Sequence, residues 1–431
     1  MFRITRIGFF LGLILALMSC TAEPDTAGSQ LELAFDDNNG GLELPKGFQA
    51  VVVAENVGPA RHITVRDNGD IYVALSEKQQ EGGIAALRDT NDDGVADQTE
   101  YFGEHTGTGI DIREGYLYRS SDLEVFRYPL PNEGLAPTAQ PETIVTGLPE
   151  QSQHAAKSFT FDQAENIYVN IGGPSNACQE EMRSPGSPGQ DPCPQLEQHG
   201  GIWQFSATQT EQTQQQNGHR YATGIRNAVA LEWNDSINKL YLVQHGRDQL
   251  NALWPDRFSK KEGVQLPAEE FFSVEDGDNF GWPYSYYDHF QEKKVLAPEY
   301  GGDGNEVGRA ANFEDPIHAF PAHWAPNDLL FYNADQFPEK YQNGAFVAFH
   351  GSWNRAPKPQ EGYRITFLPF DGENPSGEHE TFAENFAGMD NIESPGDAEY
   401  RPMGLAIGPN GTLYVSDSVK GKIWRIVYTG N

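Results

Sequence analysis

Basic and imidazole side chains recur in loops beside short apolar segments, and they are the residues best suited to chemistry in this sequence. A neutral imidazole can take a proton as a general base, whereas guanidinium groups bind carboxylates through forked hydrogen bonds. If these loops converge in the fold, they form a site for a small polyanion. The candidates are Arg61, His154, Lys157, Arg226, Arg247, His350, Arg355 and Arg401.

A second chemical pattern is a loop at residues 89–100 that is rich in oxygen ligands. Its first nine residues read D-x-N-x-D-G-x-x-D, and Glu100 occupies the twelfth position. Side-chain oxygens at alternate positions, a glycine at the bend and a final glutamate are typical of EF-hand-like calcium loops. The alternative is a solvated acidic turn. The predicted calcium ligands are Asp89, Asn91, Asp93, Asp97 and Glu100.

The elements that must position these residues are six copies of a strand, a tight turn and a second strand that carries an aromatic residue. The clearest copy, residues 63–73, turns at Asp-Asn-Gly, which supplies the positive φ values of a hairpin. The 45 glycines and 28 prolines also favour short strands over long helices. The copies occupy residues 63–73, 109–118, 158–169, 229–242, 328–347 and 404–415.

Six such units predict an all-β fold, a six-bladed β-propeller. The apolar segment 48–54 precedes the first unit and segment 422–428 follows the last, so pairing of these N- and C-terminal strands would close the ring. A pair of β-sandwiches or a β-helix is the alternative. In a propeller, the loops before the inner strands and after the second strands share one face, and these loops hold the basic residues above.

The first 41 residues are typical of a targeting segment and a linker rather than of a folded domain. Arg3 and Arg6 precede an apolar run, 7–18, which is too short to cross a bilayer. The run ends in Leu-Met-Ser-Cys, similar to a lipobox in which Cys20 is lipidated. We therefore expect a lipoprotein signal peptide at 1–20, a flexible acidic tether at 21–41 and the propeller at 42–431, held on a bacterial membrane, the outer one, facing the periplasm or cell surface. An ordinary signal peptide is the alternative.

The net charge limits the classes of binding partner, and the cysteine content predicts a disulfide. With 30 Lys and Arg against 62 Asp and Glu, the net charge is −32, which excludes nucleic-acid binding. Once Cys20 is assigned to the anchor, Cys178 and Cys193 remain, and an even pair in an oxidising compartment predicts a disulfide. Two unpaired thiols are the alternative.

Several motifs, in their order along the chain, resemble the soluble PQQ-dependent sugar dehydrogenases, the glucose/sorbosone dehydrogenase family. The resemblance covers roughly residues 42–428. The carrying motifs are Arg61-His62-Ile63, His154 ahead of Phe159-Thr160-Phe161, YATGIRN at 221–227, DNFGWPY at 278–284, HGSWNR at 350–355 and Tyr400-Arg401-Pro402.

The resemblance implies pyrroloquinoline quinone (PQQ), a tricarboxylate, as the cofactor. His154 would be the general base, with His350 left open as the alternative, and Arg226 would polarise the quinone oxygen. Backbone carbonyls of Gly246 and Arg247 would bind Ca²⁺. The remaining residues implied to contact the cofactor are Arg61, Lys157, Asn227, Arg247, His350, Arg355 and Arg401.

The expected function is oxidation of a sugar or sugar aldehyde by hydride transfer to PQQ, with electrons passed to an external acceptor. His350 stands where the glucose-oxidising branch has a lysine, so glucose itself is not predicted. Two alternatives remain open: a calcium-dependent propeller lactonase, and a non-catalytic tethered propeller that binds a glycan or a protein.

Overall fold

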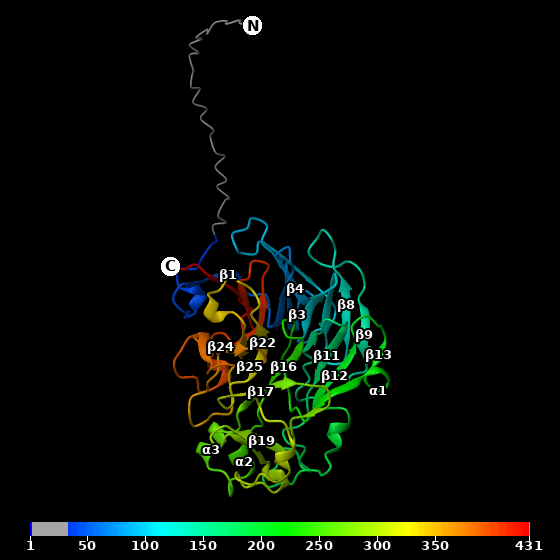
Figure 1. The fold of residues 1–431 in the computed structure, drawn as a ribbon, viewed down its shortest axis with the longest axis vertical. Helices are drawn as coiled ribbons and strands as arrows, with labels where there is room; N and C mark the ends of the chain where they lie inside the picture. Colours follow the sequence, from blue (N-terminus) through cyan, green and yellow to red (C-terminus); the bar gives the residue numbers. More distant parts are fainter. Residues whose placement is uncertain (2–32, 431) are drawn as a thin grey trace. The chain divides into compact units, whose positions relative to one another are not determined.

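Antiparallel strands dominate the computed structural model, which describes residues 1 and 33–430 (Figure 1). Apart from one two-stranded hairpin at residues 285–296, they form six sheets arranged as the blades of a propeller, with one predicted hairpin at the inner side of each blade. The innermost strands β2, β6, β10, β15, β22 and β27 surround the central channel. The predicted all-β, six-bladed architecture is therefore confirmed.

The first three blades follow the order of the chain. Blade 1 consists of β2 (Ala60–Val65), β3 (Ile71–Gln79), β4 (Gly82–Arg88) and β5 (Gln98–Phe102). Blade 2 consists of β6 (Ile110–Arg113), β7 (Tyr116–Ser120), β8 (Val125–Pro129), β9 (Glu142–Thr146) and the added β13 (Gln212–Thr213). Blade 3 consists of β10 (Phe159–Phe161), β11 (Asn166–Ile171), β12 (Gly201–Ser206), β14 (His219–Thr223) and β18 (Asp278–Asn279).

The other three blades include the one that joins both ends of the described chain. Blade 4 consists of β15 (Ala230–Asn234), β16 (Lys239–Gln244), β17 (Glu269–Val274) and β21 (His318–Phe320). Blade 5 consists of β22 (Pro326–Phe331), β23 (Gly344–Phe349), β24 (Arg364–Asp371), β25 (Asn374–Pro375) and β26 (Glu380–Ala383). Blade 6 consists of β27 (Pro402–Ile407), β28 (Leu413–Asp417), β29 (Ile423–Tyr428) and β1 (Phe48–Ala54). In it, β1 pairs antiparallel with β29, with Phe48 opposite Tyr428.

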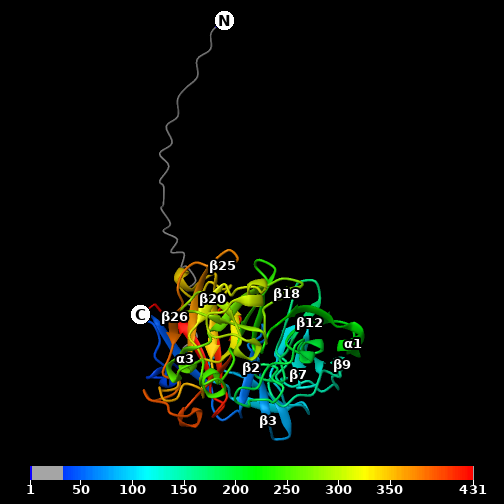
Figure 2. The ribbon, with the colours of Figure 1, turned by 90° about the horizontal axis from the view of Figure 1, so that it is seen from below.

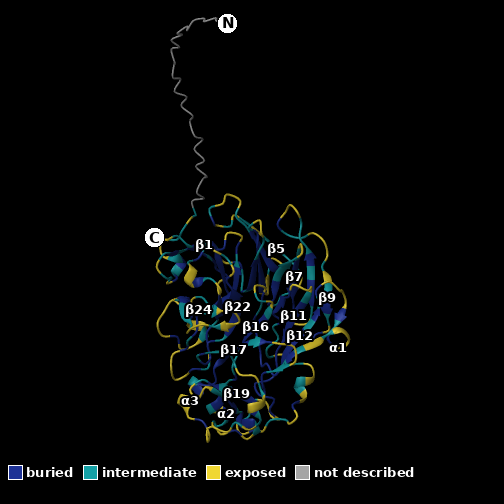
Figure 3. Ribbon diagram, viewed as in Figure 1, coloured by how far each residue is buried: buried dark blue, intermediate teal, exposed yellow. Residues whose placement is uncertain are grey.

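The aromatic residue of each second strand packs between neighbouring blades. Tyr72 and Tyr241 are fully buried, and the Tyr72 hydroxyl donates to the carbonyl of Leu135 at 2.9 Å. The other members of this set are Tyr118, Tyr168, Phe346 and Tyr414. Large rings fill the wedge between two twisted sheets, and the recurring aromatic signal is therefore a signal of blade packing. Buried residues follow the strands, and exposed residues follow the loops (Figure 3).

Short helices and loops cover the blades. Helix α1 (Gln214–Asn217) lies beside β13 at the edge of the molecule in two perpendicular views (Figure 1, Figure 2). Helices α2 (Leu250–Leu253) and α3 (Lys260–Gln265) pack near the hairpin of β19 (Ser285–Asp288) and β20 (Lys293–Leu296) around a small apolar cluster. The 3₁₀ turns are Asn39–Gly41, Pro194–Glu197, Pro298–Tyr300, Gly308–Asn312, Glu339–Tyr341 and Pro395–Asp397.

The N-terminal boundary of the folded part differs from the prediction. Residues 33–41, assigned to the tether from their composition, contact the propeller: the Ala34 amide donates to the Asp93 carbonyl at 2.7 Å, and the Trp424 indole donates to the Gly40 carbonyl at 3.2 Å. Cys20 and the rest of the predicted signal peptide lie outside the described residues. Within the described residues, no helix is long and apolar enough to cross a membrane.

Candidate active site

A cavity of about 310 Å³ opens where the loops of blades 3, 4 and 5 converge on one face of the propeller. His154 enters it from the loop before β10, Arg226 from the loop before β15 and Gly351 from the loop after β23. The structure therefore brings together three of the loops that the repeat pattern placed on one face. The other predicted site residues do not line this cavity, namely Arg61, Lys157, Asn227, His350 and Arg401. Trp353 lies at its rim with 53 % of its surface exposed.

His154 has the geometry of a general base. Its Nδ1 lies 2.5 Å from the Gly173 carbonyl oxygen, and because a carbonyl can only accept, the proton resides on Nδ1. The lone pair of Nε2 is therefore available. Burial and the nearby Arg226 charge lower the pKa of His154 to about 3, so the imidazole is neutral at physiological pH.

Glycine at position 173 permits this arrangement. A Cβ there would lie 2.4 Å from the ring of Trp282, whose indole nitrogen donates to the Asn176 carbonyl at 3.0 Å. The Gly-Trp-Pro motif thus packs beneath the loop that orients His154. The disulfide between Cys178 and Cys193 closes the same loop region, which is the predicted pairing.

Arg226 is held in place as a charged group. Its guanidinium donates to the Asn176 carbonyl at 3.3 Å and to Asp248 Oδ2 at 2.9 Å. The Gly173 amide donates to the Arg226 carbonyl at 2.7 Å, which couples this residue to the His154 loop. A positioned guanidinium beside a neutral imidazole can stabilise negative charge that develops when the imidazole removes a proton.

Four buried or half-buried cations around the axis have no carboxylate partner. Within residues 33–430, no carboxylate lies within 4.0 Å of the charged nitrogens of Arg61, Arg119, Lys157 or Arg401. Lys157 is fully buried and donates to the Ala155 carbonyl at 2.6 Å. Burial lowers the pKa of Lys157 to about 8 and that of Arg61 to about 10.

Backbone carbonyls and a hydroxyl, rather than acids, orient these guanidinium groups. Arg401 donates to the carbonyls of His350 at 2.9 Å and Gly351 at 2.8 Å, and Arg61 donates to Thr108 Oγ1 at 3.1 Å. Since neutral acceptors leave the positive charge uncompensated, this end of the channel is prepared for an anion. Arg119, which sequence reasoning missed, belongs to the same group.

Besides Arg226, which pairs with Asp248, two predicted cofactor contacts are engaged with acids of the chain. Arg247 forms a buried bidentate ion pair with Glu299, at 2.9 Å for one of its two bonds, and Arg355 pairs with Glu361 at 2.8 Å. Neither residue lines the cavity, whereas Gly246 does. The neighbouring Asn227 side chain accepts a hydrogen bond from Asn170 at 3.2 Å.

His350, the alternative base, is placed differently from His154. Its Nε2 lies 2.7 Å from the hydroxyl of Ser418, and its carbonyl accepts from Arg401. Burial and the charges of Arg401 and Arg61 hold its pKa well below the usual value. His154 lines the cavity and Nε2 has no hydrogen bond within residues 33–430, which favours His154 as the base.

Sequence reasoning missed two acids of the cavity, Asp248 and Glu269. Glu269 accepts the amides of Gly246 at 2.6 Å and Ala325 at 3.1 Å, and burial raises its pKa to about 7. The only sequence signal for Asp248 was its position after a second strand, and Glu269 begins a third strand, a position that the hairpin repeat does not cover.

The predicted calcium loop forms a turn closed by its own side chains. Asp89 accepts the Gly94 amide at 2.6 Å, Asp93 accepts the Val95 amide at 2.8 Å, and Asp97 accepts the Thr90 hydroxyl at 2.7 Å. Glu100 lies in β5 and accepts from Gln98 at 2.8 Å. These contacts account for the loop shape without a metal, so calcium binding here stays a prediction.

The opposite end of the channel carries acids. There the inner strands line a cavity of about 710 Å³ that contains Asp111, Glu232 and Asp328. Burial raises the pKa of Asp111 to about 6 and of Asp328 to about 8, and that of Glu232 well above its usual value. Asp328 and Glu232 accept backbone amides, of Leu405 and Phe331 respectively.

The fold and the cavity define a six-bladed propeller with a cationic site at one end of its channel. A family model described as TrAA12-like matches residues 42–429, so the chain belongs to the TrAA12-like family, and the family resemblance predicted from the motifs is confirmed. The chain is 24 % identical over 277 residues to a pyrroloquinoline quinone-dependent pyranose dehydrogenase of Coprinopsis cinerea. It is 29 % identical over 209 residues to an uncharacterised protein of Borreliella burgdorferi.

These sequence alignments cover 56 % and 48 % of the chain but only 36 % and 48 % of the relatives' own lengths. Solved structures match more completely. The holo form of the PQQ domain of the Coprinopsis cinerea enzyme superposes with a TM-score of 0.71 at 19 % identity, covering 90 % of this chain and 97 % of that one. A calcium structure of a Trichoderma reesei family AA12 protein gives 0.72 at 17 % identity, covering 93 % and 99 %. At such identities the superpositions show a common fold.

Proposed function

We propose that this protein is a PQQ-dependent dehydrogenase that oxidises a sugar or sugar aldehyde at the axial cavity. Two observations carry the proposal: the cations around the axis that have no carboxylate partner, and the neutral His154 in the cavity, whose Nδ1 is held by the Gly173 carbonyl. PQQ is a tricarboxylate, so it would supply the missing negative charge. The names of the related proteins support the same cofactor.

The residues present fit such a cofactor by charge and by donor chemistry. Arg61, Lys157 and Arg401 would bind its carboxylates, since forked or charge-assisted hydrogen bonds to carboxylates are the strong ones. Arg226 would face the quinone oxygen, and Asn227 lies next to it in the same loop. Arg247 and Arg355 are assigned to the scaffold rather than to the cofactor, because Glu299 and Glu361 already neutralise them.

The chain's own contribution to the reaction would be a proton transfer at a defined atom. When bound, PQQ supplies a quinone that accepts hydride from the sugar carbon. His154 Nε2 takes the hydroxyl proton of the substrate, and Gly173 holds the ring through Nδ1. Arg226 stabilises the negative charge that develops nearby, and the exposed ring of Trp353 offers a face against which a pyranose can pack.

We also propose Ca²⁺ next to the cofactor, held by the backbone carbonyls of Gly246 and Arg247. The acids Asp248 and Glu269 line the same cavity, and such carboxylate and carbonyl oxygens are the ligands that calcium prefers. A divalent cation would also compensate the buried Glu269.

The test is reconstitution of the whole chain with PQQ and Ca²⁺. We expect one equivalent of PQQ by titration calorimetry and absorption, and dye reduction with some members of a panel of pyranoses and sugar aldehydes. Absence of stoichiometric PQQ binding would overturn the proposal.

His154→Ala should retain PQQ and lose turnover by about 10² to 10⁴. The matched control is His219→Ala, an exposed histidine that pairs with Asp276 outside the cavity and should leave turnover unchanged. If His154→Ala keeps full turnover and His350→Ala abolishes it, the base is His350.

The cellular location is proposed from the first twenty residues alone. We propose that Cys20 carries a lipid that holds the protein on the outer membrane, facing the periplasm or the cell surface. Cys20→Ser should release the protein from the membrane fraction and abolish incorporation of labelled fatty acid. Unchanged fractionation and labelling would contradict the anchor.

A further inference from the structure

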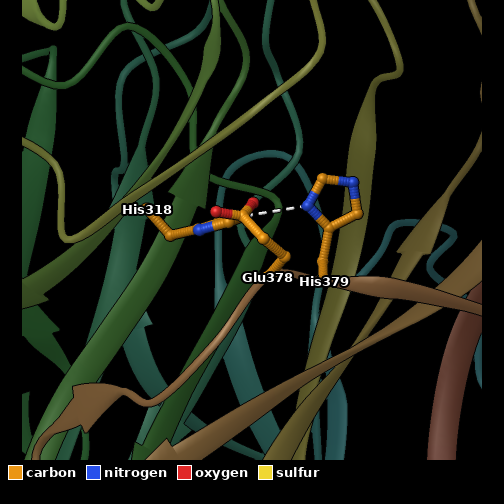
Figure 4. Close-up of side chains that lie close together, drawn as sticks. All are labelled: His318, Glu378 and His379. Carbon is orange, nitrogen blue, oxygen red and sulfur yellow. Dashed lines mark hydrogen bonds between the residues drawn. The ribbon is translucent and has the colours of Figure 1, made fainter.

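Two histidines and a glutamate meet at the outer edge of the propeller, between blades 4 and 5 (Figure 4). His318 begins β21, the outermost strand of blade 4, and Glu378 and His379 lie directly before β26 of blade 5. One ligand atom of each residue lies within 4.8 Å of the others. Within the described residues, no other group of three histidine, cysteine or acidic side chains has its ligand atoms this close together.

The two imidazoles are already in close contact. His318 Nε2 and His379 Nδ1 are 2.9 Å apart and share one proton, so one ring donates to the other. In such a hydrogen bond the accepting nitrogen carries no proton, and an unprotonated ring nitrogen is the form that binds metals.

The surroundings fix the rings but leave the carboxylate unused. His379 packs against Phe320 and Trp324, with ring centroids 4.8 Å and 5.9 Å apart. The Glu378 side chain is exposed, and within residues 33–430 it has no hydrogen bond or ion pair. The Glu378 carboxylate is therefore free to join the two rings as a third ligand.

We propose that His318, Glu378 and His379 form a binding site for a divalent transition metal, Zn²⁺ in the first place, that connects blades 4 and 5. Two imidazole nitrogens and one carboxylate oxygen are a known zinc donor set, and a water molecule can complete the tetrahedron because Glu378 faces solvent. The site is separate from the axial cavity and does not depend on the proposed dehydrogenase activity.

Binding requires only small changes in the chain. With metal–nitrogen bonds of about 2.0 to 2.1 Å, the two ring nitrogens must separate from 2.9 Å to about 3.3 Å. The shared proton moves to the other nitrogen of its own ring, so both imidazoles stay neutral and no net proton is released. The exposed loop that carries Glu378 can supply this movement.

Zinc titration of the chelator-treated full chain, without a histidine tag and with excess Ca²⁺, tests the site. Calcium saturates oxygen sites and does not compete for imidazole. We expect one equivalent of Zn²⁺ that His379→Ala weakens by about tenfold or more, since a ligand contributes at least as much as an outer-shell partner. We expect Glu378→Gln to weaken zinc binding as well. Because this substitution changes only an exposed side chain, the loss cannot be ascribed to misfolding.

Two controls make the result decisive. His219→Ala removes an exposed histidine elsewhere and should bind zinc like the wild type. Cu²⁺ bound to the wild type should show two coupled nitrogens in its electron paramagnetic resonance spectrum, and one in His379→Ala. The proposal is overturned if wild type and His379→Ala bind zinc equally, or if only His154→Ala loses the equivalent, since the metal then occupies the axial cavity.

Discussion

The two ends of the central channel collect buried charges of opposite sign, and the chain neutralises them in different ways. At the active-site end, Arg61, Lys157 and Arg401 donate only to neutral acceptors. At the other end, Asp111 and Asp328 accept from the backbone and from hydroxyl groups, without a lysine or arginine within 4.0 Å among the described residues. Apart from the Arg226–Asp248 pair in the cavity, neither end is balanced by ion pairs among the described residues.

The two ends differ in whether their buried groups can lose their charge by a change of protonation. Burial raises the pKa of Asp328 to about 8, so this acid is mostly protonated at pH 7 and the far end loses much of its charge. Guanidinium groups stay protonated even with a lowered pKa, as the value of about 10 for Arg61 shows. Only an external anion can therefore compensate the active-site end.

Reversing a charge at the active-site end should have the largest effect. We expect Arg401→Glu to weaken PQQ binding on the order of a thousandfold, because it removes one charge-assisted contact and adds a repulsive charge. Titration calorimetry measures the affinity. Arg401→Lys keeps the charge but loses the fork and should fall in between. Unchanged affinity in the glutamate variant would show that the cations do not bind the cofactor.

Removal of the acid from the buried Arg247–Glu299 ion pair should destabilise the fold, because we assign this arginine a structural role. In Glu299→Gln, Arg247 remains buried without a counter-charge, and we expect a loss of about 3 kcal/mol in the free energy of unfolding. Urea unfolding measures it. The matched control is Glu142→Gln, whose half-exposed side chain pairs with Arg127 and should contribute about 1 kcal/mol or less. A similar small loss for both variants would contradict the assignment.

The far end should show a smaller, pH-dependent effect. The pKa of Asp111 is about 6 in the folded protein and about 4 when unfolded, so the folded state holds its proton more tightly. Its contribution to stability is complete below about pH 4 and is lost as the pH rises to 6. Asp111→Asn should abolish this decline and be more stable above pH 6 by on the order of 1 to 3 kcal/mol. Parallel stability curves between pH 4 and 7 would contradict it.

Much of the fold could be predicted because its signals are local. Each hairpin needs only a turn such as Asp-Asn-Gly and β-branched flanks, and each second-strand aromatic packs where the blades meet. The disulfide followed from loop composition and from the pair of cysteines that remains once Cys20 is assigned to the anchor. The predicted end of the tether was wrong because it also relied on local signals. Residues 33–41 have the composition of a solvated segment, but the indole of Trp424, almost four hundred residues away, donates a hydrogen bond to the Gly40 carbonyl.

The candidate site could be predicted in its cations but not in its acids. Loop positions in the repeat placed His154, Arg226 and Arg401 on one face. Whether a given arginine is free depends on distant acids: Glu299 lies 52 residues from Arg247, and nothing in the local sequence marks the pair. Asp248 and Glu269 entered the cavity unpredicted for the same reason.

By itself, the sequence determined the strands, the blades and the face on which basic loops gather, because hairpin turns and alternating burial are properties of neighbouring residues. Only the tertiary structure decided which of those basic residues keep an uncompensated charge and which histidine keeps a free nitrogen. Ion pairing, desolvation and the tautomer of His154 are set by groups that are close in space and far apart in the chain.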